Sequence, residues 1–314
     1  MKGLINYRSL IKQVYRYSRN RSYRHSEKIW PYVQIQRQAD GCMGNLRYLG
    51  KAIPVLTVAE LSQRRKDDLV IIASGPSIQK VDLGLLKNAD WMAVNGAVNI
   101  LDRYPAQALN YYVVIDQGFA QDQIGIIASV VSNPNVTFVT NLFCLNKVYE
   151  LLGRAAVKAK LVLFEDRQKP VYLPRVDFDT MGQRGQNEAE KLVWQADKQV
   201  GFSLDLYRGY VSGGTVVYLS LQLAAAMGYK RVYLAGVDMT RFNEPRFYES
   251  QQNRLGTRLD VEFEKTIYPS FYLAAQIFQQ LGMQGYNLCL DSGLDDAIFP
   301  RIDLAQHLGL QDAS

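Results

Sequence analysis

Three short segments combine glycine with hydroxyl or carboxylate side chains, a pattern typical of sites that bind phosphate. They read Ser-Gly-Pro-Ser at 74–77, Ser-Gly-Gly-Thr at 212–215 and Gly-Val-Asp at 236–238. Glycine lets the backbone approach a ligand closely, and free amides or hydroxyls beside it can bind an anion. The first segment is neither a GxGxxG nor a GxxxxGKS motif, so it does not indicate NAD or ATP bound in those modes. An ordinary tight turn is the alternative.

The second segment precedes an apolar run, 216–227, that predicts a long helix. Ser212 or Thr215 could cap this helix, and its free amides and dipole would then form an anion site. The alternative is a well-capped core helix that contacts no ligand.

The third segment leads into a charged loop that ends at Tyr248. Arg241 and Arg246 lie in this loop, and guanidinium groups suit bidentate contacts with phosphate or carboxylate. Tyr248 could donate a hydrogen bond to a departing phosphate oxygen. A solvated charged loop without a ligand is the alternative.

Continuous apolar runs with helical stretches between them predict the scaffold that positions these segments. The runs span 69–73, 91–94, 111–115, 136–139 and 231–235. They favour an α/β fold, a Rossmann-like, mostly parallel sheet with helices on both faces. Small or polar residues follow each run: Ser74, Asn95 and Gly96, Asp116, Asn141, and 236–238. Because ligands bind at the carboxyl ends of parallel strands, we expect the site there.

The chain divides into two predicted parts. Residues 1–66 form a basic, aromatic N-terminal arm and connector, and 67–314 form the α/β domain. Within that domain, 165–210 is rich in Gln, Arg, Asp and Gly and shows no clear strand. We interpret 165–210 as an inserted lid over the site; a surface excursion is the alternative.

The net charge of +6 is concentrated in the arm. Within 1–38, Glu27 alone opposes the basic residues Lys2, Arg8, Lys12, Arg16, Arg19, Arg21, Arg24, Lys28 and Arg37. Tyrosine and tryptophan side chains are interleaved with them, Tyr7 among them. Such a segment suits an anionic membrane surface. A helix docked on the domain by its aromatics is the alternative.

Histidine and cysteine are too scarce and too scattered to indicate a metal site or a histidine-based mechanism. The two histidines, His25 and His307, each lie near a terminus, and the three cysteines have no paired spacing. No apolar run reaches the roughly 18 residues of a spanning helix, and a secretory signal is not evident. A cytoplasmic location is the expectation.

Two motifs together resemble a known family. The first joins 71–80 to 92–97, and the second runs from 215 through 228–240 to 245–250, with Asp-Ser-Gly-Leu at 291–294 downstream. They resemble the lipopolysaccharide-core transferases of 3-deoxy-D-manno-octulosonic acid (Kdo), third-Kdo type. More distantly, they are similar to bacterial sialyltransferases that use CMP-sialic acid. The resemblance covers 67–301 and leaves out the arm.

The resemblance implies an inverting glycosyltransferase that moves Kdo from CMP-Kdo to the lipopolysaccharide inner core. It would need no metal or cofactor besides this donor, and would lie on the cytoplasmic face of the inner membrane. Tyr248 would stabilise the departing CMP phosphate. Thr240 replaces a second tyrosine of the sialyltransferases, so Arg246 or Arg241 could compensate. The implied donor-binding residues are Ser74, Gly75, Pro76, Ser77, Asn95, Gly96, Gly214, Thr215 and Gly236.

The general base is predicted to be a carboxylate. The sialyltransferases are thought to use a histidine downstream of the tyrosine loop, but 264–271 contains none. Asp116 is favoured because partial burial at a strand end would raise its pKa towards working pH. Asp238 is the rival, although it could instead tie down the loop backbone.

Three alternatives to the Kdo transferase remain open. One is a sialyltransferase, another CMP-sugar transferase or a pyrophosphokinase-like protein that shares the Gly-Pro-Ser segment. Another is a nucleic-acid-binding protein that uses the arm, although no nucleic-acid motif appears and the basic residues lie outside the sheet domain. The last is an inactive scaffold.

Overall fold

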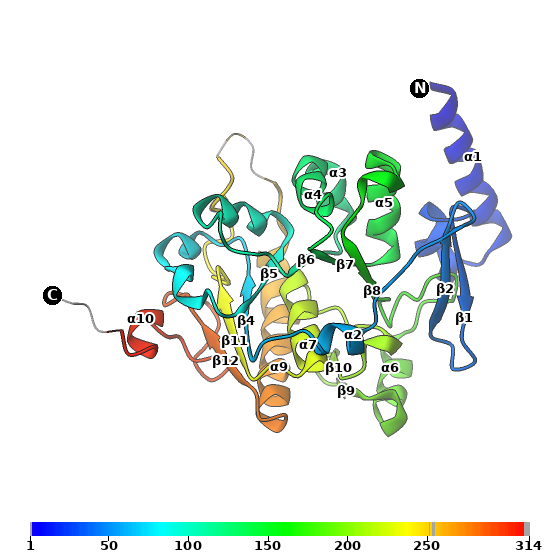
Figure 1. Ribbon diagram of the computed structural model, residues 1–314. Coiled ribbons are helices and arrows are strands. Elements are labelled where there is room, and N and C mark those ends of the chain that lie inside the picture. Colours follow the sequence, from blue (N-terminus) through cyan, green and yellow to red (C-terminus); the bar gives the residue numbers. More distant parts are fainter. Residues whose placement is uncertain (1, 251, 253–254, 311–314) are drawn as a thin grey trace.

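The computed structural model describes residues 2–250, 252 and 255–310, with side chains from residue 9 onward. Its centre is a seven-stranded parallel sheet in the order β12-β11-β4-β5-β6-β7-β8 (Figure 1). The strands are β4 (Asp68–Ile72), β5 (Asp90–Val94), β6 (Tyr111–Val114), β7 (Thr137–Thr140), β8 (Lys160–Leu163), β11 (Arg231–Ala235) and β12 (Gln284–Asn287). The predicted α/β fold is confirmed. The two edge strands, β8 and β12, were not among the predicted runs because both are short and β12 is largely polar.

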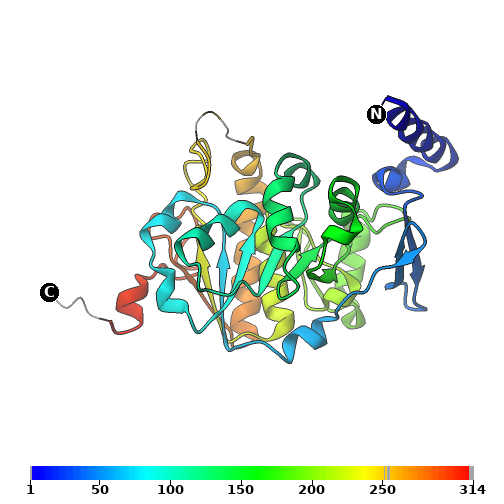
Figure 2. The ribbon, with the colours of Figure 1, turned by 45° about the horizontal axis from the view of Figure 1, so that its top comes forward.

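Alternate side chains of the strands enter two cores, one on each face of the sheet. Val70, Trp91 and Tyr112 face one core, and Leu69, Met92 and Tyr111 face the other. The first face is covered by α3 (Gln117–Asp122), α4 (Ile124–Val131) and α5 (Leu142–Leu152), and the second by α2 (Val58–Ser62), α7 (Val216–Met227) and α9 (Tyr268–Gln280). In Figure 2 the green helices α3–α5 and the orange α9 lie on opposite sides of the sheet. The predicted helices on both faces are therefore confirmed.

The chain order creates a switch point between β4 and β11. From β4 the strands are added in one direction out to β8, and the chain then returns through α7 to place β11 on the other side of β4. Loops that leave neighbouring strands in opposite directions open a crevice at their carboxyl ends. The segments 74–77 and 236–238 both begin at this point.

Several further elements of the domain are short helices. They are η2 (Pro76–Lys80), η3 (Leu83–Leu86), η4 (Asn95–Arg103), η5 (Arg154–Ala156), η6 (Glu188–Glu190), η7 (Leu206–Arg208), α8 (Leu259–Glu262), the π-helix η8 (Phe263–Ile267) and α10 (Leu304–His307). Among the described residues, the structure contains no helix with the length and apolar character needed to cross a bilayer.

The inserted segment 165–210 contains a β-hairpin, so the expectation that it lacks strands is wrong. After α6 (Phe178–Gly185), β9 (Leu192–Gln195) pairs antiparallel with β10 (Val200–Ser203). The Tyr218 hydroxyl of α7 donates to the Gly201 carbonyl at 2.8 Å, and the Gln222 side chain accepts from the Ser203 amide at 3.0 Å. The hairpin therefore packs on α7 and α9, which its own sequence does not reveal. Its role as a lid stays a prediction.

The arm is a folded part of the molecule, built from α1 (Lys2–Ser18), η1 (Arg21–Lys28) and the strands β1 (Val33–Arg37), β2 (Met43–Tyr48) and β3 (Lys51–Ala52). Arg37 binds both oxygens of Glu165, at 2.7 and 3.0 Å, and Tyr48 packs on Tyr149 of α5. Ile29 and Val33 lie in the core. Tyr15 of α1 is buried and packs on Trp30 and on Tyr172 of the domain, so the docked alternative describes this part of 1–38. Met1 and 311–314 lie outside the described residues, as do the side chains of Lys2, Tyr7 and Arg8.

Candidate functional site

The first and third glycine segments meet at the switch point. The Gly75 amide donates to the Gly236 carbonyl at 2.9 Å, and the Ser77 amide donates to Asp238 Oδ2 at 3.0 Å. The Ser77 hydroxyl donates to the other oxygen of the same carboxylate. Ser77 was expected to offer a hydroxyl near free amides, but its hydroxyl and its own amide are both bound to Asp238. The loop after β4 is therefore held in shape from β11.

Close packing of these loops explains two of the glycines. A Cβ on Gly75 would lie 2.6 Å from the Asp238 side chain and from the Gly236 carbonyl oxygen. Gly236 has a φ of +70°, which favours glycine, and a Cβ there would lie 2.6 Å from the Ala73 carbonyl oxygen. Both positions thus require glycine for contact between the loops themselves. Pro76, which lies between Gly75 and Ser77 in the chain, is the first residue of η2.

Tyr248 lies against the carboxyl end of β5. A Cβ on Gly96 would overlap its ring, and the Phe247 amide donates to the Ser74 carbonyl at 3.2 Å. The loop after β11 therefore folds back over both β4 and β5. Burial raises the pKa of Tyr248 to about 12, with Glu249 adding to the rise and Arg246 opposing it. The hydroxyl of Tyr248 thus stays protonated at neutral pH and can donate a hydrogen bond.

Two buried polar atoms near this loop have no partner among the described residues. They are Oδ1 of Asn95 and Oγ1 of Thr240. Asn95 also has a left-handed backbone, with a φ of +49°. Because an unpaired buried acceptor costs about 1–3 kcal/mol, such atoms mark places where a ligand would complete the hydrogen bonding. A strained backbone at the same residue is a further feature of functional sites.

Arg246, predicted to contact phosphate, is bound within its own loop. Its guanidinium lies 2.6 Å from Glu249, whose side chain is 3% exposed. Glu249 also accepts from the Arg246 amide at 3.1 Å. Arg241 is exposed and lies 3.8 Å from Glu244. Arg246 therefore shapes the loop that carries Tyr248.

Thr215 caps α7, as predicted, by accepting from the Val217 amide at 3.4 Å. The contacts described for its neighbour Gly214 are with η8: a Cβ there would lie 2.8 Å from Ile267 Cγ1. These contacts do not join the start of α7 to Gly75. The phosphate role of Gly214 and Thr215 remains a prediction.

The two predicted bases occupy different environments. Asp116 is exposed and caps α3, accepting from the Gly118 amide at 2.7 Å, so the expected partial burial is wrong. It lies beyond the buried part of β6, where the chain turns out into the helix. Asp238 is buried, with both oxygens bound to Ser77. The alternative interpretation, that Asp238 ties down the loop, describes its contacts.

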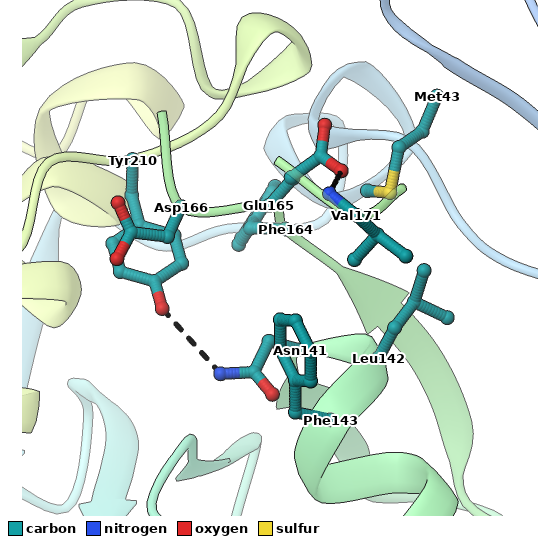
Figure 3. A pocket seen from close by; sticks show the side chains of 9 residues that line it. All are labelled: Met43, Asn141, Leu142, Phe143, Phe164, Glu165, Asp166, Val171 and Tyr210. Carbon is teal, nitrogen blue, oxygen red and sulfur yellow. Dashed lines mark hydrogen bonds between the residues drawn. The ribbon is translucent and has the colours of Figure 1, made fainter. Parts of the chain in front are cut away.

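A further polar cluster at the carboxyl ends of β7 and β8 was missed from the sequence. It surrounds a small pocket lined by Met43, Asn141, Leu142, Phe143, Phe164, Glu165, Asp166, Val171 and Tyr210 (Figure 3). Asn141 donates to the Tyr210 hydroxyl at 3.4 Å. Only Asn141 could be anticipated, as a residue that follows a strand. The others come from the arm, from α5, from the residue after β8 and from the inserted segment, which only folding brings together.

His25 also reaches this region, although it lies near the N-terminus in the sequence. Its Nε2 lies 2.8 Å from the Pro170 carbonyl oxygen, and its ring packs on Phe143. Burial lowers the pKa of His25. Within the described ranges, His, Cys, Asp and Glu side chains nowhere gather in threes as they would around a metal ion.

The fold and this geometry define a Rossmann-like α/β protein whose candidate ligand site lies at the switch point of a parallel sheet. The family model described as 3-deoxy-D-manno-octulosonic acid transferase WaaZ matches residues 54–305. The chain belongs to this family of Kdo glycosyltransferases, which confirms the resemblance. The match begins before the expected residue 67 and includes α2.

Two relatives carry the name "Probable 3-deoxy-manno-octulosonic acid transferase". The Escherichia coli K12 protein is 26% identical over 273 residues, covering 83% of this chain and 90% of that protein. The Salmonella typhimurium LT2 protein is 26% identical over 276 residues, covering 84% and 96%. No solved structure matches the chain.

Proposed function

We propose that this chain transfers Kdo from CMP-Kdo to a sugar hydroxyl of the lipopolysaccharide inner core. Inversion at the anomeric carbon and independence of metal are part of the proposal. The observation that carries it is the meeting of Tyr248 with the Asn95–Gly96 corner, beside the β4 loop. A protonated hydroxyl and unpaired polar atoms lie there, at the switch point where an α/β sheet binds nucleotides.

CMP is a good leaving group, so the protein must chiefly orient the reactants and offset the charge that develops on phosphate. Tyr248 donates its hydroxyl proton in a hydrogen bond to the departing phosphate. Asn95 Oδ1 and Thr240 Oγ1 accept hydrogen bonds from hydroxyl or amino groups of the sugar donor. Asp238 keeps the β4 loop in position through Ser77. The reaction needs no cofactor besides the donor.

The test is transfer by the purified protein to an inner-core acceptor, followed by mass analysis. Parallel reactions contain CMP-Kdo, CMP-sialic acid or ATP, with and without a chelator. Kdo addition from CMP-Kdo alone, unaffected by chelation, is expected. Transfer of sialic acid instead would replace this proposal with the sialyltransferase alternative. Loss of transfer on chelation would overturn metal independence.

The arm provides the second part of the proposal, attachment to the anionic cytoplasmic face of the inner membrane. Leu10, Val14 and Tyr17 form one face of α1, and their exposed fractions are 58%, 50% and 89%. The neighbouring basic residues Arg19, Arg21, Arg24 and Lys28 are also exposed. An apolar helix face beside cationic side chains suits the surface of an anionic membrane, where the glycolipid acceptor resides.

A further inference from the structure

The Asp-Ser-Gly-Leu segment at 291–294 follows β12 and packs against the loop that follows β11. The Ser292 hydroxyl donates to the Val237 carbonyl at 2.8 Å. The Gly293 amide donates to the Asp238 carbonyl at 2.7 Å. Two successive residues after β12 thus bind two successive carbonyls after β11.

The contact continues to the next two residues of the β11 loop. A Cβ on Gly293 would overlap the Met239 carbonyl oxygen and would lie 3.1 Å from Cγ2 of Thr240. Met239 has a left-handed backbone, with a φ of +49°. A residue other than glycine keeps such a backbone only where the surrounding structure holds it there. The bonds from Ser292 and Gly293 supply that restraint on both sides of the turn.

Hydrogen bonds also fix the segment that supplies these contacts. Ser292 Oγ accepts from the Leu294 amide at 3.2 Å, and both side chains are buried. Asn287, which ends β12, donates to the same Val237 carbonyl at 3.4 Å and accepts from the Cys289 amide at 3.0 Å. A serine hydroxyl has one proton to donate, and Ser292 gives it to Val237. Ser292 is therefore placed to shape the loop and not to donate to a ligand.

Asp238 connects this contact to the candidate site. Its carbonyl is held by Gly293, and its carboxylate is bound to the amide and hydroxyl of Ser77. The three loops leave neighbouring strands, in the order β12, β11, β4 (Figure 1). The shape of the β4 loop thus depends on the β12 loop, through a single buried aspartate.

We propose that Ser292 and Gly293 are positioning residues for donor binding. They hold the turn at 237–240 so that the carboxylate of Asp238 meets Ser77, and they do so without touching the donor. This inference rests on the proposed function, because its effect is measured as affinity for CMP and for CMP-Kdo. It adds the loop after β12 to the machinery that binds the nucleotide.

The first test is Ser292→Ala, measured well below its unfolding temperature. We expect the Kd of CMP and the KM for CMP-Kdo to rise by about threefold to tenfold, the range that corresponds to one neutral hydrogen bond. The value of kcat should change less, because the groups that act on the reacting atoms remain. Calorimetric titration and initial rates measure these constants.

Thr140→Val is the matched control. The buried Thr140 hydroxyl donates to the Val114 carbonyl at 2.6 Å, so it joins the ends of β6 and β7 as Ser292 joins those of β11 and β12. This variant should lower the unfolding temperature about as much as Ser292→Ala and leave the Kd of CMP unchanged. An equal loss of CMP affinity in Thr140→Val would show that affinity follows stability alone, and would overturn the inference.

A double variant tests whether Ser292 acts through Asp238. Effects of residues that share one contact are not additive. We therefore expect Ser292→Ala combined with Asp238→Asn to bind CMP about as weakly as Asp238→Asn alone. A loss equal to the product of the two single losses would overturn the inference.

If Ser292→Ala does not fold, Gly293→Ala takes its place, because the added methyl group must displace the Met239 carbonyl. Wild-type affinity for CMP in the variant tested would overturn the inference while leaving the proposed function intact. Failure of the wild-type protein to bind CMP would instead refute the proposed function.

Discussion

Asp238 binds Ser77 with both carboxylate oxygens, although 161 positions separate the two residues. The contact joins the carboxyl ends of β4 and β11 at the point where the strand order reverses. It gives the loop after β4 a fixed shape before any ligand binds. Asp238 therefore positions the site, and its removal should affect binding more than proton transfer.

Asp238→Asn should weaken CMP binding. An amide has one accepting oxygen, so the Ser77 hydroxyl would have to turn and accept from the amide nitrogen, and neither bond would be made to a charged group. Hydrogen bonds to charged groups contribute about 1.5–3 kcal/mol, and we expect an affinity loss of about tenfold or more together with a lower unfolding temperature. Calorimetric titration with CMP measures it, and Ser77→Ala should reproduce part of the effect. Unchanged affinity with a hundredfold lower kcat would restore Asp238 as the base.

Gly96→Ala should displace Tyr248. The added methyl group would overlap the tyrosine ring, so the loop after β11 must move. We expect kcat to fall about as far as in Tyr248→Phe while the sheet remains folded. Gly125→Ala in α4 is the matched control, because a Cβ there meets nothing within 4 Å. Wild-type kcat in Gly96→Ala would contradict the role given to this contact.

Tyr248→Phe should lower kcat by about a hundredfold to a thousandfold, as expected when one donor to a developing charge is lost. The pKa of Tyr248 is raised to about 12, so the donating, protonated form persists through neutral pH and is lost only as pH rises through that value. Tyr248 should therefore contribute no alkaline decline below about pH 11. A decline near pH 9 that is absent from Tyr248→Phe would refute this assignment.

Cytidine nucleotides should stabilise the protein more than other nucleotides. A ligand at 100 times its Kd adds about 2.7 kcal/mol to the free energy of unfolding. Thermal unfolding with CMP, CTP, AMP and UMP at equal concentration measures the ranking. We expect CMP and CTP to give the larger shifts. A larger shift with AMP would remove the main support for a CMP-sugar donor.

Leu10→Glu combined with Val14→Glu should release the protein from vesicles that contain anionic lipids. The exposed face of α1 would then carry two negative charges in place of apolar side chains. Deleting 1–38 is a poorer experiment, because Ile29 and Val33 of that segment belong to the core. Leu281→Glu, a 49% exposed leucine at the end of α9, is the matched control. Sedimentation with vesicles measures binding, and unchanged binding by the double variant would exclude this face of α1.

Much of the sheet could be read from the sequence because its central strands are buried on both faces. Runs such as 69–73 and 111–115 are apolar throughout, which few structures other than an internal parallel strand produce. Edge strands lack this signature, and β12 (Gln284–Asn287) has only one neighbour in the sheet. The hairpin of β9 and β10 is stabilised by its contacts with α7 and α9. Because these contacts lie outside its own segment, the sequence of the hairpin resembles that of a loop.

The loops that form the site could be located from the sequence, but their contacts could not. That Gly75, Asn95 and Gly236 follow strands places them at one edge of the sheet, since parallel strands all end there. The local pattern around Asp116 gave no sign that this residue is exposed, and the pattern around Asp238 allowed a tie to the loop backbone without indicating Ser77 as the partner. Burial and pairing depend on which distant segment packs against a side chain.

Periodicity and strand-end residues by themselves thus determined the class of fold, the edge of the sheet where the candidate site lies and the segments that reach this edge. The tertiary structure alone decided that Asp116 is exposed, that Arg246 is bound to Glu249, and that His25 of the arm meets Pro170. The physical reason is the distance along the chain over which each property is set. Strand formation depends on residues that are neighbours in the sequence, whereas pKa values and hydrogen-bond partners depend on residues that only the folded chain brings together.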